Sequence, residues 1–297
     1  MSDAIAVVRR FNRSYTQRIG LLEGSFLGMG MPLGPARLLF EIGSAAAVGQ
    51  APPTTHTLRA RLGLDSGYLS RLLRHLEKDG LVAVSSDPAD RRRRQVTLTE
   101  AGRGRWQELE RRSDDQARLI VDPLTERQRE RLVRALSEAD LLVRAATVEF
   151  APVDPASPVA RDVVGRYFAE IGRRFGFDGA SGETEKDTRL LIQPTGVFIV
   201  AVSDGEPVAC GGLHTIAPGV GELKRMWVHD DWRGAGLGTR LLRHLEGQAR
   251  GLGHTVVRLD TNKALTEAIT MYGRAGYRAI DRYNDNPWAT HFFEKSL

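Results

Sequence analysis

A glycine-rich turn in the second half of the chain is the clearest chemical signal in the sequence. Three glycines alternate at 234, 236 and 238, between an apolar β-rich run and an amphipathic segment of helical spacing. Such a turn exposes backbone N–H groups at a helix N-terminus, which suits a pyrophosphate. The segment lacks the Gly-Lys-Ser/Thr of a P-loop and the acidic residue of a Rossmann unit, which argues against both of those nucleotide sites.

A predicted helix that begins after Asp65 carries the second signal. Its four leucines recur at the spacing of one helical face, so the opposite face presents small and basic residues, namely Gly67, Ser70, Arg71 and Arg74. Small residues allow close approach to the major groove of DNA, and arginine can contact phosphate or the edge of guanine. An ordinary surface helix would also show this pattern, so the helix alone leaves both interpretations open.

The hairpin after this helix favours the DNA-binding interpretation. Its tip begins at Asp87 and contains four consecutive arginines at 91–94, and its second strand leads into Val96-Thr-Leu-Thr-Glu-Ala-Gly102. This pattern resembles the wing of the MarR family of regulators, an Asp-x-Arg step followed by Val-x-Leu-Thr-x-x-Gly. Asp90 and Arg92 match that step. The resemblance implies a carboxylate that orients a guanidinium, which enters the negative potential of a narrow minor groove.

The distribution of charge along the chain and the flanking helices agree with the MarR resemblance, which covers about residues 5–148. Residues 1–150 contain 24 Lys and Arg and 19 Asp and Glu, whereas the remaining residues contain 18 of each. The whole positive excess therefore lies in the half that would bind double-stranded DNA. In the MarR family the first and last helices of the domain build a two-fold dimer. The resemblance thus implies a homodimer through the predicted helices at 3–18 and 125–148.

A second resemblance predicts which ligand the glycine-rich turn binds. The turn resembles motif A of the GNAT N-acetyltransferases, Arg/Gln-x-x-Gly-x-Gly/Ala, which Arg233, Gly236 and Gly238 match. Further along, 259–262 and 268–277 resemble motif B, an Asn followed by a helix that ends Tyr-x-x-x-Gly-Phe/Tyr. The resemblance covers roughly residues 158–297 and implies direct acetyl transfer from acetyl-CoA to an amine. The rival hypothesis is a domain that only senses acetyl-CoA or another ligand.

The resemblance also assigns the residues of the cofactor site. It places the CoA pyrophosphate on the backbone amides of 234–239 and the pantetheine arm beside the strand at 226–228. Asn262 matches a residue that hydrogen-bonds the pantetheine amides. The predicted acetyl-CoA site comprises Met226, Trp227, Val228, Arg233, Gly234, Ala235, Gly236, Leu237, Gly238, Thr239 and Asn262.

Two residues are predicted to carry the proton transfers. Tyr272 matches the tyrosine that gives a proton to the departing CoA thiolate, although it shares a helical face with apolar residues and could instead be a core position. Amide formation also needs a neutral amine, and Glu222, at the start of the strand that leads to the turn, is the predicted base. His214 on the neighbouring strand is the alternative base. Cys210 is expected to be a buried thiol rather than a nucleophile.

The acetyl acceptor is the least specified partner. The segment 283–288 lies between the last two predicted strands, and its Asn284 and Asn286 could bind a small polar amine. Arg225 could bind a carboxylate of the same molecule. Asn, Asp and Pro are also what an ordinary β-turn uses, so both interpretations stay open. A small metabolite such as an amino acid is preferred over a protein lysine.

Two domains are needed to position these residues. Residues 1–150 are predicted to form a mainly α winged helix-turn-helix domain, with one hairpin among its helices. Residues 159–297 are predicted to form an α/β domain with a mixed sheet, because helices alternate with β-rich runs. Three prolines within 151–158 predict a semi-rigid linker between the two.

Composition limits the remaining possibilities. A chain of 297 residues with 41 % hydrophobic and 27 % charged residues is typical of globular proteins. No apolar run reaches the ~20 residues that cross a bilayer, and the first residues lack the apolar region of a signal peptide. A cytoplasmic protein without a membrane partner is therefore expected. A single cysteine cannot form an internal disulfide, and no Cys/His cluster has zinc spacing, so no metal is expected.

Overall fold

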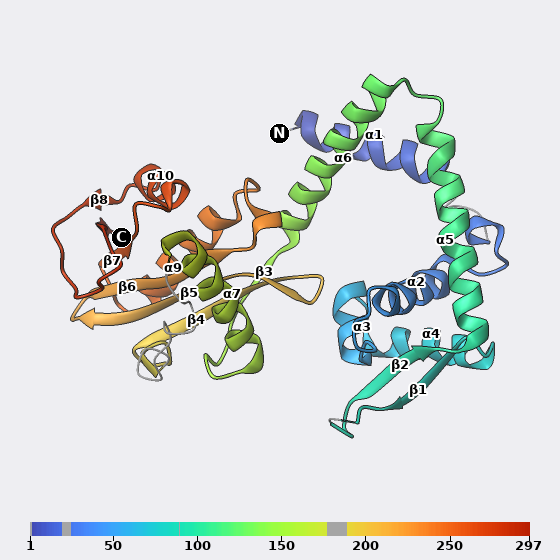
Figure 1. Cartoon of the computed structure of the whole chain (residues 1–297), viewed down its shortest axis with the longest axis horizontal. Helices are drawn as coiled ribbons and strands as arrows, with labels where there is room; N and C mark the ends of the chain where they lie inside the picture. The colour runs from blue at the N-terminus through green and yellow to red at the C-terminus, as the bar shows by residue number, and fades with distance from the viewer. Residues whose placement is uncertain (1, 20–24, 89, 177–188) are drawn as a thin grey trace. The chain divides into compact units, whose positions relative to one another are not determined.

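The computed structural model describes residues 2–19, 25–88, 90–176 and 189–297, and the chain divides into two compact units, Met1–Ala135 and Leu136–Leu297 (Figure 1). This boundary lies earlier than the predicted one at residue 150, because the last turns of α6 (Glu126–Thr147) pack within the second unit. Ala145 and Val148 belong to the core of that unit, and Arg240 Nη2 donates a hydrogen bond to Val148 O at 3.3 Å.

The N-terminal unit is a winged helix-turn-helix. Thr54 and Asp65 cap two of its helices, because their side chains accept hydrogen bonds from Thr57 N at 3.1 Å and Tyr68 N at 2.9 Å. The four leucines of the second of these helices are buried in the core. The elements are α1 (Ser2–Arg18), η1 (Phe26–Gly28), α2 (Leu33–Ala47), α3 (Thr55–Leu62), α4 (Ser66–Lys78), β1 (Val82–Ser86), β2 (Arg94–Leu98) and α5 (Glu100–Val121), followed by the start of α6.

The junction of β2 and α5 explains the Thr-x-x-Gly part of the wing signature. Thr99 is the N-cap of α5, since its Oγ1 accepts a hydrogen bond from Gly102 N at 3.0 Å, and it donates to Gly80 O at 2.6 Å. A Cβ on Gly102 would lie 1.8 Å from Leu81 O. Only glycine allows this approach, so the motif fixes the wing against α5.

The C-terminal unit is a mixed sheet with helices on its faces. The strand order is β3-β4-β5-β6-β7-β9-β8, in which β6 and β7 are parallel and the other neighbours are antiparallel. The strands are β3 (Glu149–Pro152), β4 (Gly196–Ser203), β5 (Glu206–Ala217), β6 (Val220–Val228), β7 (Val256–Thr261), β8 (Arg278–Ala279) and β9 (His291–Ser296). The helices are α7 (Pro158–Phe175), η3 (Asp230–Trp232), α9 (Leu237–Gly251) and α10 (Thr266–Arg274).

Side chains alternate along the strands and give each face of the sheet its own core. Ile199 and Leu213 pack with Leu241 of α9, whereas Phe198 packs with Val163 of α7. Helices α7 and α9 therefore cover opposite faces of the sheet (Figure 1).

The segment predicted as a linker, 151–158, is ordered within the second unit. Its first two residues end β3, an edge strand in which Pro152 lies opposite Ile199 of β4. Proline is tolerated at a sheet edge because it has no partner on its outer side. Ser157 then caps α7 by accepting a hydrogen bond from Ala160 N at 3.3 Å, and Pro158 occupies the first turn. Pro152 thus ends a strand, and Pro158 begins a helix.

In the part of the chain that the structure describes, no helix is long and apolar enough to cross a membrane. The same residues contain no group of three His, Cys, Asp or Glu side chains that could hold a metal ion. Cys210 is buried with a free thiol. Burial raises the pKa of this thiol to about 12, so it is protonated at neutral pH, in agreement with its predicted inertness.

Candidate active site and nucleic-acid interface

Strands β6 and β7 separate where the predicted acetyl-CoA site begins. Their parallel pairing ends at Leu223 opposite Leu259, whereas β6 continues to Val228. A β-bulge accompanies the separation, because two residues of β6, Arg225 and Met226, face the space of one on β5, and Arg225 has a φ of 54°. A cavity of about 610 Å³ is lined by residues from both separated strands.

The glycine-rich turn leads from β6 towards α9. Gly234 and Gly236 have φ angles of 85° and 77°, in the left-handed region that favours glycine. Gly236 is the N-cap of α9 and has no side chain to accept hydrogen bonds from the first amides of the helix. These amides can therefore meet an anion. A Cβ on Gly238 would lie 3.2 Å from Met271 Sδ, so this glycine lets α9 approach α10.

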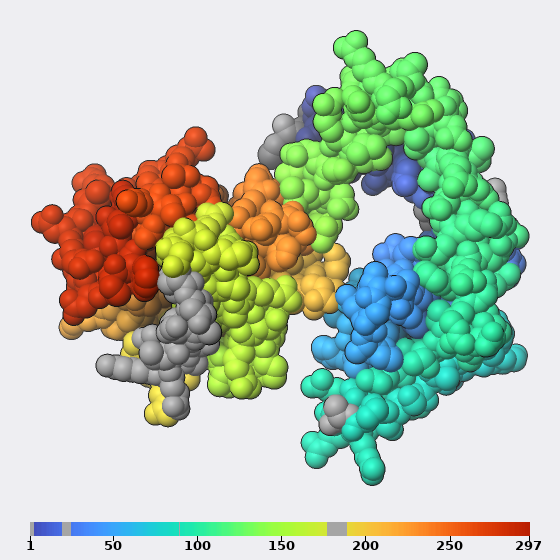
Figure 2. All heavy atoms as spheres, viewed as in Figure 1, coloured from blue at the N-terminus to red at the C-terminus, as the bar shows by residue number. Residues whose placement is uncertain are grey.

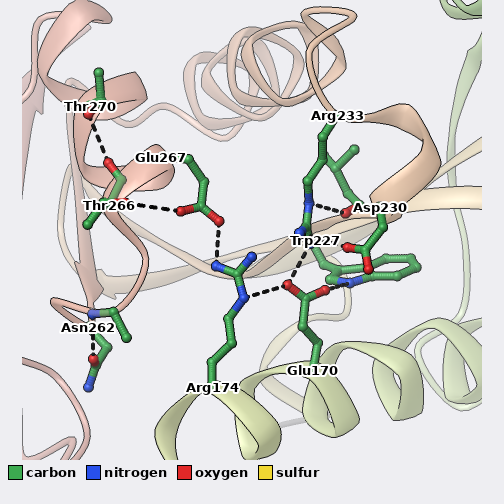
Figure 3. Close-up of polar contacts among 11 residues, drawn as sticks. Glu170, Arg174, Trp227, Asp230, Arg233, Asn262, Thr266, Glu267 and Thr270 are labelled. Atoms are coloured by element: carbon green, nitrogen blue, oxygen red, sulfur yellow. Dashed lines mark hydrogen bonds and ion pairs between the residues drawn. The ribbon is translucent and has the colours of Figure 1, made fainter.

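Arg233 is held by protein groups (Figure 3). Its guanidinium contacts Glu170 Oε1 at 2.5 Å and Asp230 Oδ1 at 2.7 Å, and its Nε donates to Val228 O at 3.2 Å. Glu170 is buried on α7 and also accepts a hydrogen bond from Trp227 Nε1 at 2.8 Å. In this structure Arg233 shapes the turn, and the indole of Trp227 is directed to Glu170 of α7.

The remaining predicted cofactor residues differ in how they could contact a ligand. Met226 and Asn262 line the cavity, whereas the side chain of Leu237 is buried in the core. Asn262 Nδ2 donates to Trp288 O at 2.7 Å, and its Oδ1 accepts a hydrogen bond from Ala264 N at 2.9 Å. Its amide therefore organises the surrounding loops. Three more predicted residues, which contribute backbone amides or small side chains, are half-buried at the same helix start: Ala235, Gly238 and Thr239.

Tyr272 lies on α10 and lines the cavity with its ring buried. Its hydroxyl donates to Met226 Sδ at 3.8 Å. Burial, with smaller effects of Tyr167 and Asp260, raises the pKa of Tyr272 above its usual value. The hydroxyl therefore keeps its proton at neutral pH. The ring also packs against Tyr277, with centroids 5.8 Å apart, so Tyr272 both belongs to the core and lines the cavity.

Glu222 is buried among hydrogen-bond donors. Its Oε1 accepts from Tyr283 Oη at 2.8 Å and Asn284 Nδ2 at 2.9 Å, and its Oε2 lies 2.8 Å from His214 Nε2 and 3.1 Å from Lys224 Nζ. Burial alone would raise the pKa of this carboxyl, but the hydrogen bonds and the ammonium outweigh burial and lower the pKa to about 2. These surroundings argue against Glu222 as the direct proton acceptor.

His214 lies on β5 directly opposite Glu222. Its Nδ1 is buried and has no hydrogen-bond partner among the described residues, while the ring lines the cavity. A carboxylate that holds one nitrogen of an imidazole leaves the other nitrogen to exchange a proton. The alternative base of the sequence analysis therefore has the more suitable surroundings.

The predicted acceptor residues hold the segment 283–288 against the sheet. Asn284 Nδ2 donates to Asp260 Oδ2 at 2.6 Å, and Asn286 Nδ2 donates to Asp260 Oδ1 at 2.9 Å. Arg225 is buried, and its guanidinium lies over the ring of Phe168 at 5.7 Å from the centroid. The cavity described above is lined by Asn284, Asn286, Asp260, Arg225 and Phe168.

Three residues of this region were not singled out from the sequence: Asp260, Tyr167 and Glu170. Asp260 stands within the motif B segment, one position after Leu259, and strand alternation would have placed it on the face opposite that core residue. Tyr167 and Glu170 are three residues apart on α7, but no motif distinguishes them from other positions of an amphipathic helix. Their role depends on contacts between distant segments.

The predicted DNA-binding face of α4 is exposed. Gly67, Ser70, Arg71 and Arg74 are all solvent-accessible. Ser70 Oγ donates to Ser66 O at 2.7 Å, and Arg74 Nε donates to Ser70 O at 3.3 Å, so both side chains also contact the helix backbone. The guanidinium of Arg71 lies over the ring of Tyr68 at 5.5 Å.

The wing differs in one detail from the expectation. Figure 2 shows the wing, in teal, as a projection from the N-terminal unit. Asp90 Oδ1 accepts a hydrogen bond from the backbone N–H of Arg92 at 3.0 Å, whereas its ion pair is with Arg93 Nε at 3.3 Å. The carboxylate therefore orients the guanidinium of Arg93 and shapes the backbone at Arg92, because a tight turn brings Arg93 N to Asp90 O. Ala89 at the tip lies outside the described residues.

Comparisons with known proteins match both units. The profile of the acetyltransferase (GNAT) family matches residues 167–277, and that of the MarR family matches residues 29–93. An IAA acetyltransferase of Azospirillum brasilense is 32 % identical over 144 residues, which cover 46 % of this chain and 92 % of that protein. An uncharacterized N-acetyltransferase of Escherichia coli is 30 % identical over 148 residues, 43 % of this chain and 87 % of that protein.

Among solved structures, a GNAT family acetyltransferase from Staphylococcus aureus is 16 % identical with a TM-score of 0.44, and covers 51 % of this chain and 99 % of that chain. The relatives with at least 30 % identity are matched over most of their length. The chain therefore belongs to the GNAT family, as an N-acetyltransferase with acetyl-CoA as co-substrate, and it carries a MarR family segment in its N-terminal unit.

Proposed function

We propose that this chain transfers the acetyl group of acetyl-CoA to the amine of a small metabolite and that its winged helix binds double-stranded DNA as a regulator. The observation that carries the enzymatic half is Tyr272, a protonated phenol at a cavity lined by the two separating strands. The exposed face of α4 beside a basic wing supports the DNA-binding half.

The cofactor would occupy the split between β6 and β7. The amides at the start of α9 would bind its pyrophosphate, since Gly236 leaves them without a capping side chain. The amides of the pantetheine arm would pair with the backbone of β6 beyond Leu223, where β7 no longer does so. The thioester would then lie near Met226 and Tyr272.

The reaction needs one proton acceptor and one donor. We assign the proton of the substrate ammonium to His214 Nδ1, with Glu222 as the residue that positions the imidazole. The free amine attacks the thioester carbonyl, a C–N bond forms, and the C–S bond breaks. The departing thiolate takes the proton of the Tyr272 hydroxyl, and the second proton that the amine nitrogen loses as the amide forms returns to the phenolate.

The walls of the cavity indicate the class of acceptor. The lining includes the apolar residues Phe168, Ile171 and Leu191 and also two groups of opposite charge, Asp260 and Arg225. A carboxylate attracts an ammonium, and a guanidinium suits a carboxylate. We therefore propose a small amine with an apolar portion, such as an amino acid.

A homodimer is part of this proposal. Helix α1 exposes apolar side chains at near-helical spacing: Ile5 is 63 % exposed, Val8 57 %, Phe11 48 % and Tyr15 43 %. A helix with so many exposed apolar residues usually packs against a partner. A two-fold dimer through α1 would cover them, and the test is sedimentation of Phe11→Glu, which should shift the chain towards the monomer.

The direct test of the enzyme is a panel of amines incubated with acetyl-CoA while thiol release is measured. Tyr272→Phe should lower kcat more than it raises the KM for the amine, because the proton is needed only as the thiolate leaves. A matched control is Tyr277→Phe, which also removes a buried hydroxyl, but one outside the cavity. Equal kcat for wild type and Tyr272→Phe would exclude Tyr272 as the acid. No thiol release with any amine would favour a sensor domain.

A further inference from the structure

A series of ion pairs connects the two sides of the split between β6 and β7 through α7 (Figure 3). The guanidinium of Arg174, in the last turn of α7, lies between two carboxylates. Its Nε is 3.1 Å from Glu170 Oε1, and its Nη1 donates to Glu267 Oε1 at the start of α10. Glu170 also holds Arg233, which follows β6, whereas α10 follows β7. Arg174 therefore joins the segments that leave the two separated strands.

The two ends of this connection differ in how firmly they are held. Glu170 is buried and also accepts hydrogen bonds from Trp227 Nε1 and Arg233 Nη2. The side chain of Glu267, in contrast, is 52 % exposed. Burial would raise the pKa of this carboxyl, but hydrogen bonds and the charge of Arg174 outweigh burial and lower the pKa, so Glu267 is charged at neutral pH. Exposed ion pairs are weak. The connection can therefore open at Glu267 while it stays anchored at Glu170.

The pair of Arg174 and Glu267 lies at the rim of the cavity that Tyr272 lines. The lining of that cavity includes chain neighbours of both paired residues, namely Ile171, Phe175, Leu265 and Ala268. Glu267 itself lines a second cavity, of about 780 Å³, which reaches Thr239 in the first turn of α9. A cofactor that extends from the first amides of α9 to Tyr272 would therefore pass beside this pair.

We infer that Arg174 and Glu267 form a clasp that opens and closes the cofactor cleft. The closed clasp joins α7 to α10 across the split and retains the pantetheine arm. The open clasp releases Glu267, while Arg174 stays on Glu170. Because the pair consists of protein groups alone, it can close with or without bound CoA and should slow entry and exit of CoA alike. The inference rests on the proposed location of the cofactor between β6 and β7, and it adds to that proposal a control of cofactor exchange.

The test is stopped-flow mixing of the full chain with CoA, followed by tryptophan fluorescence. The observed rate plotted against CoA concentration gives the association rate constant as its slope and the dissociation rate constant as its intercept. Glu267→Gln keeps the shape of the side chain and removes its charge, so both rate constants should rise about fivefold while Kd changes little. Adding Arg174→Met to this variant should cause no further rise, because the two residues act as one pair.

The matched control is Glu294→Gln, which breaks a partly exposed ion pair with Arg258. This pair also joins two elements, β9 and β7, but neither residue lines either cavity. Both rate constants should therefore keep their wild-type values. Arg174→Met alone breaks the same pair as Glu267→Gln and should reproduce its parallel rise, and thermal unfolding checks that each variant folds.

Two results would overturn the inference. The first is unchanged rate constants for Glu267→Gln. The second is faster dissociation with unchanged association, which would make the pair an ordinary support of bound CoA. Failure of the proposed cofactor location would look different, because Gly236→Val would then bind CoA as tightly as wild type.

Discussion

Glu222 is a single buried carboxylate that connects β5, β6 and the segment 283–288 through its hydrogen-bond donors. Its negative charge is stabilised only in the folded chain, where the pKa is about 2 instead of 4.5. Because the folded pKa is the lower one, this contribution to stability is present above pH 4.5 and is lost as the pH falls towards 2. It amounts to about 3 kcal/mol at neutral pH.

Glu222→Gln should therefore lower the free energy of unfolding by about 2–3 kcal/mol at pH 7, with a smaller deficit at acidic pH. The measurement is urea denaturation of the full chain at pH 7 and near pH 3. Glu149→Gln, an exposed position on β3 of the same sheet, is the control and should change little. A deficit that stays constant with pH would mean that the charge of Glu222 does not contribute.

At the scale of elements, the turn between β6 and α9 depends on backbone shape. Gly236→Val should abolish binding of acetyl-CoA, because a β-branched residue is strained at a φ of 77° and its side chain would stand before the first amides of α9. Calorimetry with acetyl-CoA measures this. Gly247→Ala is the matched control within α9, where an added Cβ meets no atom within 4 Å. Unchanged affinity of Gly236→Val would refute the cofactor site.

Helix α7 is joined to the same turn by Glu170, which contacts Arg233 and Trp227. Glu170→Gln should raise the KM for acetyl-CoA several-fold with a smaller effect on kcat, because the arginine that shapes the turn loses its buried counter-charge. Asp162→Asn on the exposed side of α7, which breaks an ion pair with Arg166, is the control. Loss of kcat alone, with an unchanged KM for acetyl-CoA, would contradict a positioning role of Glu170.

Features that depend on a few neighbouring residues of one element were predictable from the sequence. The caps at Thr54 and Asp65, the leucine face of α4 and the glycines before α9 are local patterns, and each predicts its element from a few neighbouring residues. The partners of Arg233 and Glu222 were not predictable in this way, because they come from segments up to 63 residues away along the chain. Edge strand β3 was missed because its Pro152 is followed closely by Pro155 and Pro158, a spacing typical of a linker.

At the scale of the whole molecule, the proposal combines DNA binding with a dimer of the chain. If a dimer docks two α4 helices, it should protect a pseudo-palindrome whose half-sites lie about one helical turn apart, ~10 bp. The natural DNA to test is the promoter beside the coding sequence of this protein. The measurement is titration of duplex DNA at two salt concentrations.

Substitutions of the arginines in α4 and in the wing should weaken the proposed DNA binding in different ways. If Arg92 enters the minor groove as proposed, Arg92→Ala removes one contact per subunit, so affinity should fall on most sequences and the salt slope should flatten by up to ~2 for the dimer. Arg71→Ala or Arg74→Ala should cost about 1–3 kcal/mol at particular base pairs if the residue contacts a base edge, and should behave like Arg92→Ala if it contacts phosphate. Arg127→Ala, an exposed arginine at the start of α6, is the control. At ~0.1 M salt, screening still leaves specific contacts intact. If the wild type then binds no duplex more tightly than random DNA, the regulator half of the proposal is wrong. The proposal of acetyl transfer would be unaffected.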